Sequence, residues 1–186
     1  MKSILSFIIL LCSFSASAGY VEVGTTGSYY KSTIDDYNYE EKKDVSLSIS
    51  YYFWAQSALE LSATSRLNVT KVGTSDVNSQ VTIQTESLMY GLDFVLSLAD
   101  MKADFRPYVK VGGLYIHKRV VQTTAAFPYE VIPFEDGIAP SAGVGLKLKL
   151  TELLSLKIGA EAWSLPLGNN KAQYDYAGRA GLSWVF

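Results

Sequence analysis

The sequence has very little of the residue types from which disulfides and metal sites are built. Its 186 residues include one cysteine, Cys12, and one histidine, His117. A single cysteine cannot form a disulfide within the chain, and a lone histidine leaves no ligand cluster for a metal ion. The sequence therefore predicts no disulfide, no metal site and no bound cofactor.

The chain also lacks a large excess of charge of either sign. Lys and Arg number 16 and Asp and Glu number 18, which gives a formal net charge of −2. A slightly acidic chain is a poor ligand for polyanions. Nucleic acid and an anionic lipid surface are therefore not expected as partners.

Long apolar runs are absent except at the N-terminus. Lys2 precedes the apolar run 4–11, and the small residues 16–18 follow it. This order is typical of a secretory signal peptide, so we expect residues 1–18 to be removed and the mature chain to begin at Gly19. Cys12 follows the bulky Leu11, whereas a lipoprotein signal has a small residue at that position. After residue 18 no run is long enough for a membrane helix, so in a membrane this chain would have to form a closed barrel.

The last residues form an alternating strand that ends on an aromatic residue. Tyr174, Tyr176, Trp184 and Phe186 lie on one face of this strand. The two aromatic pairs are centred ten residues apart, and a strand of that length tilted by about 40° spans roughly 25 Å. This is the height of the apolar band on a transmembrane barrel, which has an aromatic belt at each interface.

Alternating segments recur along the rest of the chain and predict eight strands. The expected strands are 20–32, 44–54, 58–72, 81–98, 105–122, 139–150, 154–165 and a last one after residue 171. The connections 34–43 and 123–138 are long, whereas 55–57 and 151–153 are short. Alternating long and short connections indicate a meander with both termini on the periplasmic side.

The two faces of these strands differ in a way that distinguishes a membrane barrel from a soluble one. A soluble eight-stranded barrel or sandwich also alternates polar and apolar residues. Here the polar face is rich in small residues such as Ser46, Ser48, Gly143 and Gly145, which suit a tight interior. The apolar face is broad and suits lipid. We therefore interpret residues 19–186 as one all-β domain, an eight-stranded antiparallel up-and-down transmembrane β-barrel.

Charged residues fall on the face that is expected to point inward. They are Glu22, Glu60, Asp93, Lys110, Lys147, Lys149, Lys157, Glu161 and Arg179. Unpaired charges in so narrow an interior would cost several kcal/mol, so we expect these residues to form ion pairs and to fill the lumen. The alternative is that they line a narrow path for ions or small solutes.

Two segments resemble a known family. The ending Arg179-x-Gly181-x-x-Trp184-x-Phe186 resembles the C-terminal assembly signal of bacterial outer-membrane barrels. Residues 106–113 resemble the Pro-Tyr-Val-x-x-Gly strand of small barrels of the outer-membrane protein A, outer-membrane protein X and opacity-protein type. We expect no peptidoglycan-binding segment after Phe186, as in the free-standing members of this family.

The resemblance implies a location and a set of partners. It implies a Gram-negative outer membrane, surrounding lipid and lipopolysaccharide, and recognition by the barrel-assembly machinery. Such small barrels act mainly in adhesion, colonisation, resistance to host defence or membrane integrity. The chain is therefore expected to be a surface-exposed structural or interaction protein, with host surfaces or other outer-membrane proteins as further partners.

Catalysis is an alternative function, because some barrels of this size modify lipid A with a histidine, a serine and a carboxylate near the outer rim. The deacylase pattern has Ser two residues after the His, and here that position is Arg119. No carboxylate lies close to His117 in sequence to orient it. The chain is therefore not expected to be an enzyme, and lipid A modification is kept as a lesser alternative.

The longest connection is unusually apolar for an exposed tip. It contains Phe127, Tyr129, Ile132 and Phe134. Exposed apolar patches are often binding sites, so this segment is a candidate contact loop. The alternative is that its aromatic residues fold back onto the strand ends and cap the lumen.

Overall fold

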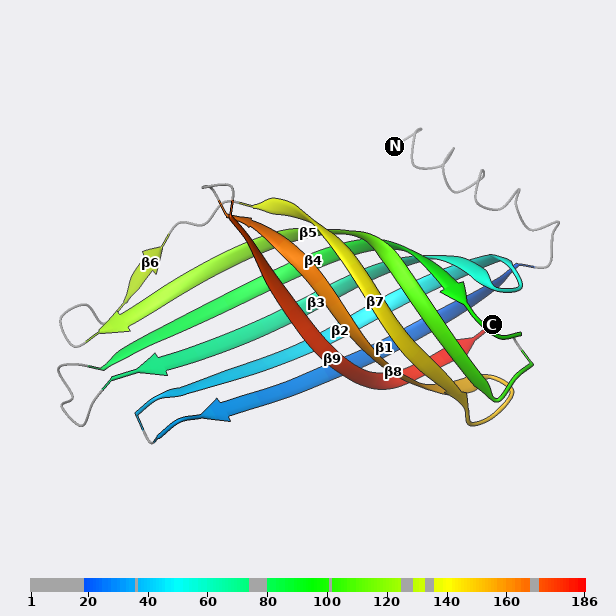
Figure 1. The fold of residues 1–186 in the computed structure, drawn as a ribbon, viewed down its shortest axis with the longest axis horizontal. Helices are drawn as coiled ribbons and strands as arrows, with labels where there is room; N and C mark the ends of the chain where they lie inside the picture. The colour runs from blue at the N-terminus through cyan, green and yellow to red at the C-terminus, as the bar shows by residue number, and fades with distance from the viewer. Residues whose placement is uncertain are drawn as a thin grey trace.

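The computed structural model describes residues 19–35, 37–73, 80–100, 102–124, 129–132, 136–167 and 171–186, with all side chains except those of 132, 165–167 and 171–173. These residues form nine strands and no helix (Figure 1). The strands are β1 (Tyr20–Thr33), β2 (Tyr39–Trp54), β3 (Ser57–Val72), β4 (Val81–Ser97), β5 (Phe105–Thr124), β6 (Glu130–Ile132), β7 (Gly137–Lys149), β8 (Leu154–Leu167) and β9 (Lys171–Val185).

Eight of the strands close into a barrel. Each pairs antiparallel with the next wall strand along the chain, and β1 pairs with β9 to close the ring. The short β6 pairs only with Val120–Gln122 of β5 and is not part of the wall, so β5 is followed in the wall by β7. The predicted all-β, eight-stranded antiparallel up-and-down β-barrel is confirmed.

The main correction to the predicted boundaries concerns the first connection. Residues 34–43 were expected to join two strands, yet β2 begins at Tyr39 and β1 continues to Thr33. The register explains why these polar residues form strands: Lys31 faces Glu41, and the Lys43 ammonium lies 5.6 Å from the ring centroid of Tyr29. Opposite charges and cation–π contacts across the two strands stabilise a ladder that has no apolar face.

The turn between β1 and β2 is organised by Asp35. Its Oδ1 accepts hydrogen bonds from the backbone N–H of Tyr37 and of Asn38, each at 2.8 Å. A side chain that caps its own turn in this way is a common use of aspartate. The hydrogen bonds from the Asn38 side chain and the Tyr37 backbone also hold the pKa of Asp35 below its usual value.

Side chains alternate between an apolar outer face and a polar interior. Val45, Leu47 and Ile49 of β2 are exposed on the outside, whereas Ser46 and Ser50 are buried inside. The interior holds two small apolar clusters. One contains Met89, Leu114, Ile116, Ala139, Trp163 and Ala177, and the other contains Tyr52, Ala58, Val95 and Tyr108.

The two ends of the barrel differ. Beyond the point where β5 leaves β7, at Ile116 and Gly137, strands β1 to β5 continue as a curved sheet, while β7, β8 and β9 turn away from it (Figure 1). We call this sheet the five-strand extension. It comprises Ser28–Thr33, Tyr39–Asp44, Arg66–Val72, Val81–Ser87 and Lys118–Thr124. The extension lies at the distal end of the barrel, opposite Phe186.

Candidate functional site

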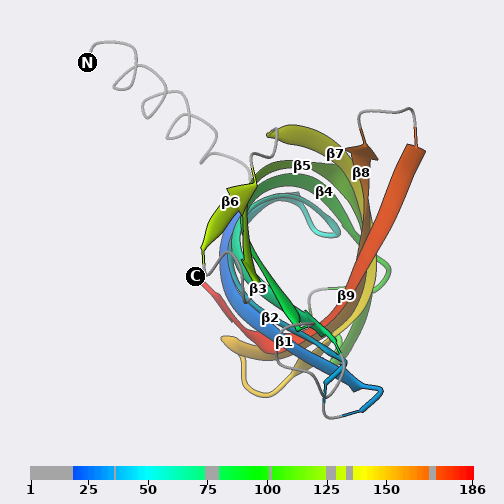
Figure 2. The same cartoon turned by 90° about the vertical axis from the view of Figure 1, so that its left-hand side faces the viewer.

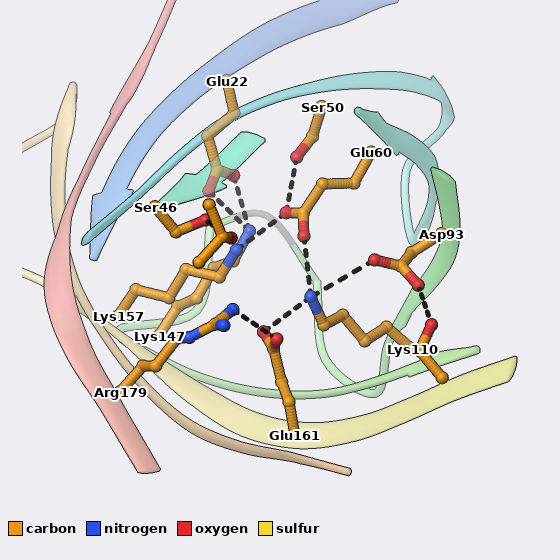
Figure 3. A network of polar contacts seen from close by, with 12 residues as sticks. Glu22, Ser46, Ser50, Glu60, Asp93, Lys110, Lys147, Lys157, Glu161 and Arg179 are labelled. Carbon is orange, nitrogen blue, oxygen red and sulfur yellow. Dashed lines mark hydrogen bonds and ion pairs between the residues drawn. The ribbon is translucent and has the colours of Figure 1, made fainter. Parts of the chain in front are cut away.

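The interior of the barrel is occupied by charged side chains from almost every wall strand. Their position follows from the two-residue period of a strand, which puts Glu22 and Gly24 of β1 on the same inner face. Each carboxylate in the middle of the barrel meets at least one cation (Figure 3).

Lys110 is the centre of this network. Its Nζ lies 3.1 Å from Glu60 Oε1, 2.6 Å from Glu161 Oε1 and 3.4 Å from Asp93 Oδ2. The other oxygen of Glu60 accepts from Lys157 at 2.7 Å and from the Ser50 hydroxyl at 3.0 Å. Glu60 thus has both carboxylate oxygens satisfied although it is buried.

Lys147 forms a second pair closer to the chain termini. Its Nζ lies 2.6 and 2.7 Å from the two oxygens of Glu22, and it donates to the hydroxyl of Tyr52 at 2.6 Å. The Tyr52 ring stacks on Tyr20 with the centroids 4.1 Å apart. This pair is buried on all sides and sits among aromatic rings.

A third group lies towards the distal end. Arg179 lies 2.5 Å from Glu161 Oε2 and 3.3 Å from Asp44 Oδ1. Arg66 reaches from β3 across the lumen and lies 2.8 Å from both Asp44 and Asp175. Asp44, Arg66 and Asp175 are not among the nine predicted lumen residues, although strand parity places all three on the inner face.

The structure differs from the expectation for one of the nine predicted lumen residues. Lys149 is the last residue of β7 and is only half-buried, and among the described residues it has no ion pair. It lies where β7 ends, at the mouth of the barrel, so its side chain is not enclosed by the lumen. The other eight predicted residues all take part in the ion pairs described above.

The charged layer leaves almost no free space. The cavity between Glu60, Tyr108, Lys110, Glu161 and Arg179 has a volume of about 10 Å³. That is room for about one water molecule. In the described residues the middle of the lumen is therefore filled rather than open.

His117 is outside the barrel, at its distal rim. It is exposed, and its Nδ1 lies 2.6 Å from Asp136 Oδ1. The other carboxylate oxygen, Asp136 Oδ2, accepts a hydrogen bond from the Tyr115 hydroxyl at 2.7 Å. The sequence did not reveal this carboxylate because it lies 19 residues further along the chain. The outward-facing Ser65 is separated from His117 by Leu88 in the register, which puts the two residues about 10 Å apart. This arrangement holds a loop against β5 and does not form a nucleophile–base pair.

The candidate contact loop is described only in part. Tyr129 is exposed, and its hydroxyl lies 2.5 Å from an Arg119 nitrogen. Ile132 ends β6, and its side chain is not described. Phe127 and Phe134 lie outside the described residues.

The four residues of the predicted assembly signal have different environments. Arg179 points into the lumen, and Trp184 and Phe186 are exposed on the outer face. Gly181 lies so close to the backbone of Thr25 and Thr26 that a Cβ atom would overlap with β1. Phe186 exchanges backbone hydrogen bonds with Val21 at 2.8 and 3.2 Å.

Neither a helical membrane span nor a metal-binding cluster is seen in the described ranges. No helix there has the length and apolar character that crossing a bilayer requires. Within the same ranges, no three His, Cys, Asp or Glu side chains are grouped to bind a metal ion.

The chain was compared with known proteins. No family model and no curated protein sequence matches it. Solved structures do match. The N-terminal β-barrel domain of Pseudomonas aeruginosa OprF is 14% identical, with 90% of this chain and 97% of that chain covered and a TM-score of 0.55. Neisserial surface protein A is 11% identical, with 90% and 95% covered and a TM-score of 0.54.

A third solved structure is similar to the same extent. The attachment invasion locus protein Ail of Yersinia pestis is 14% identical, with 90% of this chain and 97% of that chain covered and a TM-score of 0.52. At these identities the likeness shows the fold alone. The chain has the fold of the small eight-stranded outer-membrane β-barrels.

Proposed function

We propose that this chain is a surface-exposed outer-membrane barrel that acts through its distal end as a structural or interaction protein, without catalysis. The observation that carries the proposal is the contrast between a filled lumen and a large projecting sheet. Ion pairs around Lys110 occupy the middle of the barrel, and the five-strand extension projects beyond it. A molecule built in this way presents a surface rather than a pore.

In this proposal the membrane position is inferred from the aromatic residues on the outside of the barrel. On β9, Tyr174 and Tyr176 mark the outer interface, and Trp184 and Phe186 mark the periplasmic one. The extension then lies on the cell surface, among lipopolysaccharide. In this proposal residues 1–18 are removed after Ala18, and the barrel-assembly machinery recognises Arg179, Gly181, Trp184 and Phe186.

Apolar side chains at the distal tips support an interaction role. Ile34, Val72, Tyr129 and Val131 are 86%, 54%, 61% and 47% exposed. They lie at or next to strand ends, on the part of the molecule that would face away from the cell. Apolar side chains exposed on projecting strand ends are available for contact with a protein partner. The names of two similar structures, a surface protein and an attachment protein, agree with adhesion to a host surface or to another outer-membrane protein.

The proposal can be tested by making the tips polar. The variant Ile34→Ser/Val72→Ser/Tyr129→Ser/Val131→Ser should fold normally and lose most of its binding to host cells and matrix proteins when displayed on bacteria. Binding is measured by flow cytometry against cells that lack the protein. The matched control carries Thr33→Ser and Lys71→Arg in the same region and should bind like the wild type. Unchanged binding by the four-serine variant would contradict the proposal.

A narrow ion path is a second candidate. It is favoured by the charged lining of the small central cavity, in which Glu60, Lys110, Lys157, Glu161 and Arg179 meet. Conduction would require these pairs to separate, and each separation leaves buried charges without partners. Lipid A modification is favoured less, because His117 has a carboxylate partner but, among the described residues, no serine within hydrogen-bonding reach.

A further inference from the structure

The barrel wall is closed only partly between its first and last strands. The register of β1 and β9 pairs Glu22–Gly27 with Ala180–Val185 and then stops. Beyond it, Ser28–Thr33 pairs with β2 alone, and Lys171–Arg179 pairs with β8 alone. Viewed from the distal end, β9 diverges from β1 (Figure 2). We call the gap above Gly27 and Ala180 the seam opening.

A cavity fills the seam opening. Its volume is about 300 Å³, and residues of four strands line it, among them Tyr29, Lys42, Arg66, Tyr176 and Gly178. This volume is at the lower end of the range for small-molecule sites. The cavity is much larger than the central one and lies on the distal side of the charged layer.

The outer wall of the cavity suits a lipid-like molecule. Tyr29 on β1 and Tyr176 on β9 are 63% and 79% exposed and stand on the outward face of the two strands. A tyrosine has an apolar ring and a polar tip, which suits the boundary between acyl chains and headgroups. An apolar chain could therefore leave the cavity between these rings towards the outer leaflet.

The floor of the cavity is polar and includes two cationic side chains, Lys42 and Arg66. Arg66 is 7% exposed; its guanidinium pairs with Asp44 and Asp175 and lies 4.6 Å from the ring centroid of Trp163. Its Nε is buried and has no hydrogen-bond partner among the described residues. Lys42 lines the cavity beside Arg66, and its side chain is 28% exposed, so a headgroup that enters the cavity meets two cationic hydrogen-bond donors.

We propose that the seam opening binds a single-chain amphiphile of the outer leaflet, with a carboxylate or similar acceptor headgroup directed to Arg66. The apolar chain of the ligand lies between Tyr29 and Tyr176, and the filled lumen below stops it from moving further inward. A peptide strand could pair with only one edge of the opening and would leave the rest unfilled, because β1 and β9 diverge (Figure 2). The inference depends on the membrane position proposed above.

The proposal can be tested by photolabelling the full mature chain in lipid nanodiscs. The probe is a dodecanoic acid that carries a diazirine near the end of its chain, and mass spectrometry locates the adducts. Labelling should concentrate on peptides containing Tyr29 and Tyr176. Unlabelled dodecanoate should compete with the probe and reduce this labelling. Dodecyltrimethylammonium, whose headgroup accepts no hydrogen bond, should compete about tenfold less well, because a hydrogen bond to a charged group is lost. Adducts spread evenly over the lipid-facing strands would overturn the proposal.

Gly178 provides a matched pair of variants. A Cβ atom at this position would have no atom within 4 Å, so both an alanine and a larger residue fit the backbone. Gly178→Trp should reduce the labelling of the seam peptides several-fold more than Gly178→Ala does, because only the indole is large enough to occupy the cavity. Equal labelling of both variants would count against the site. If the chain shows no heat-modifiable gel shift and does not enter nanodiscs, the membrane proposal itself fails. A chain that enters nanodiscs but is not labelled at the seam contradicts the ligand site alone.

Discussion

At the scale of single residues, the lumen shows how charges become tolerable in a narrow barrel. Glu60 is buried, and both of its oxygens are bound: one by Lys110, the other by Lys157 and Ser50. A buried ion pair contributes little net stability, because the desolvation cost offsets the attraction. Removing one partner is costly, since it leaves a charge buried without compensation.

Replacing Glu60 with glutamine should therefore destabilise the barrel strongly. Glu60→Gln keeps the shape of the side chain but leaves Lys157 without a carboxylate partner, and we expect a loss of about 3–5 kcal/mol. Urea unfolding of the refolded protein in detergent, followed by gel shift, measures the change.

The control is Glu41→Gln, which removes a partner of Lys43 at the surface and should leave the unfolding midpoint unchanged. Equal midpoints for Glu60→Gln and the wild type would show that the lumen pairs do not support the fold.

A second residue-scale prediction concerns Asp136. The hydrogen bonds from Tyr115 and from His117 hold the pKa of Asp136 below its usual value of about 3.9. A lowered carboxyl pKa favours the folded arrangement above the usual value, and this contribution is lost as the pH falls through the lowered pKa. NMR titration of the carboxyl carbon should show Asp136 ionised at pH 4, and Tyr115→Phe should move its pKa upward.

Tyr90 faces Tyr115 across β4 and β5 and provides the control. Tyr90→Phe should leave the Asp136 titration as it is. An Asp136 pKa that does not respond to Tyr115→Phe would mean that the hydrogen bond does not hold this loop.

At the scale of elements, closure depends on the pairing of β1 with β9. This pairing is the shortest in the barrel wall and has Gly181 opposite Thr26. The two backbones approach so closely there that a Cβ on Gly181 would overlap with the Thr25 carbonyl oxygen. The glycine is needed for this close approach of two strands.

Gly181→Ala should therefore weaken closure. Forcing a methyl group against backbone atoms costs about 1–3 kcal/mol, and here it acts on the closing strand pair. We expect a smaller heat-modifiable fraction and slower folding into detergent or lipid vesicles. Gly178→Ala lies three residues away on the same strand, where a Cβ is free of contacts, and should fold like the wild type. Identical folding of the two variants would refute this explanation.

At the scale of the whole molecule, the filled lumen predicts that the protein does not conduct ions. Because the central cavity holds about one water molecule, the protein should give no steady conductance in planar lipid bilayers at neutral pH. A general porin inserted under the same conditions serves as the positive control. Steady, reproducible steps of conductance from the purified chain would favour the ion path over the surface role.

Much of the fold could be predicted because strand period and turn chemistry are local. Alternation along β2 predicts that Val45, Leu47 and Ile49 lie outside, and the structure exposes all three. The start of β2 was predicted too late, because residues 39–43 carry no apolar face and pair through charges and rings that only the register brings together. Asp136 was missed as the partner of His117 for the same reason, since a strand pair and a loop separate them in sequence.

The sequence by itself determined which face each side chain occupies, because neighbouring residues of a strand point to opposite sides whatever the rest of the chain does. It could not determine which charges meet. Glu22 and Lys147 are 125 residues apart, and their contact depends on the closure of the ring and on the stagger of its strands. The same closure decided that Lys149 stays at the mouth and that β1 and β9 part above Gly27. These features belong to the tertiary structure, because they depend on the relative height of strands that are distant in the chain.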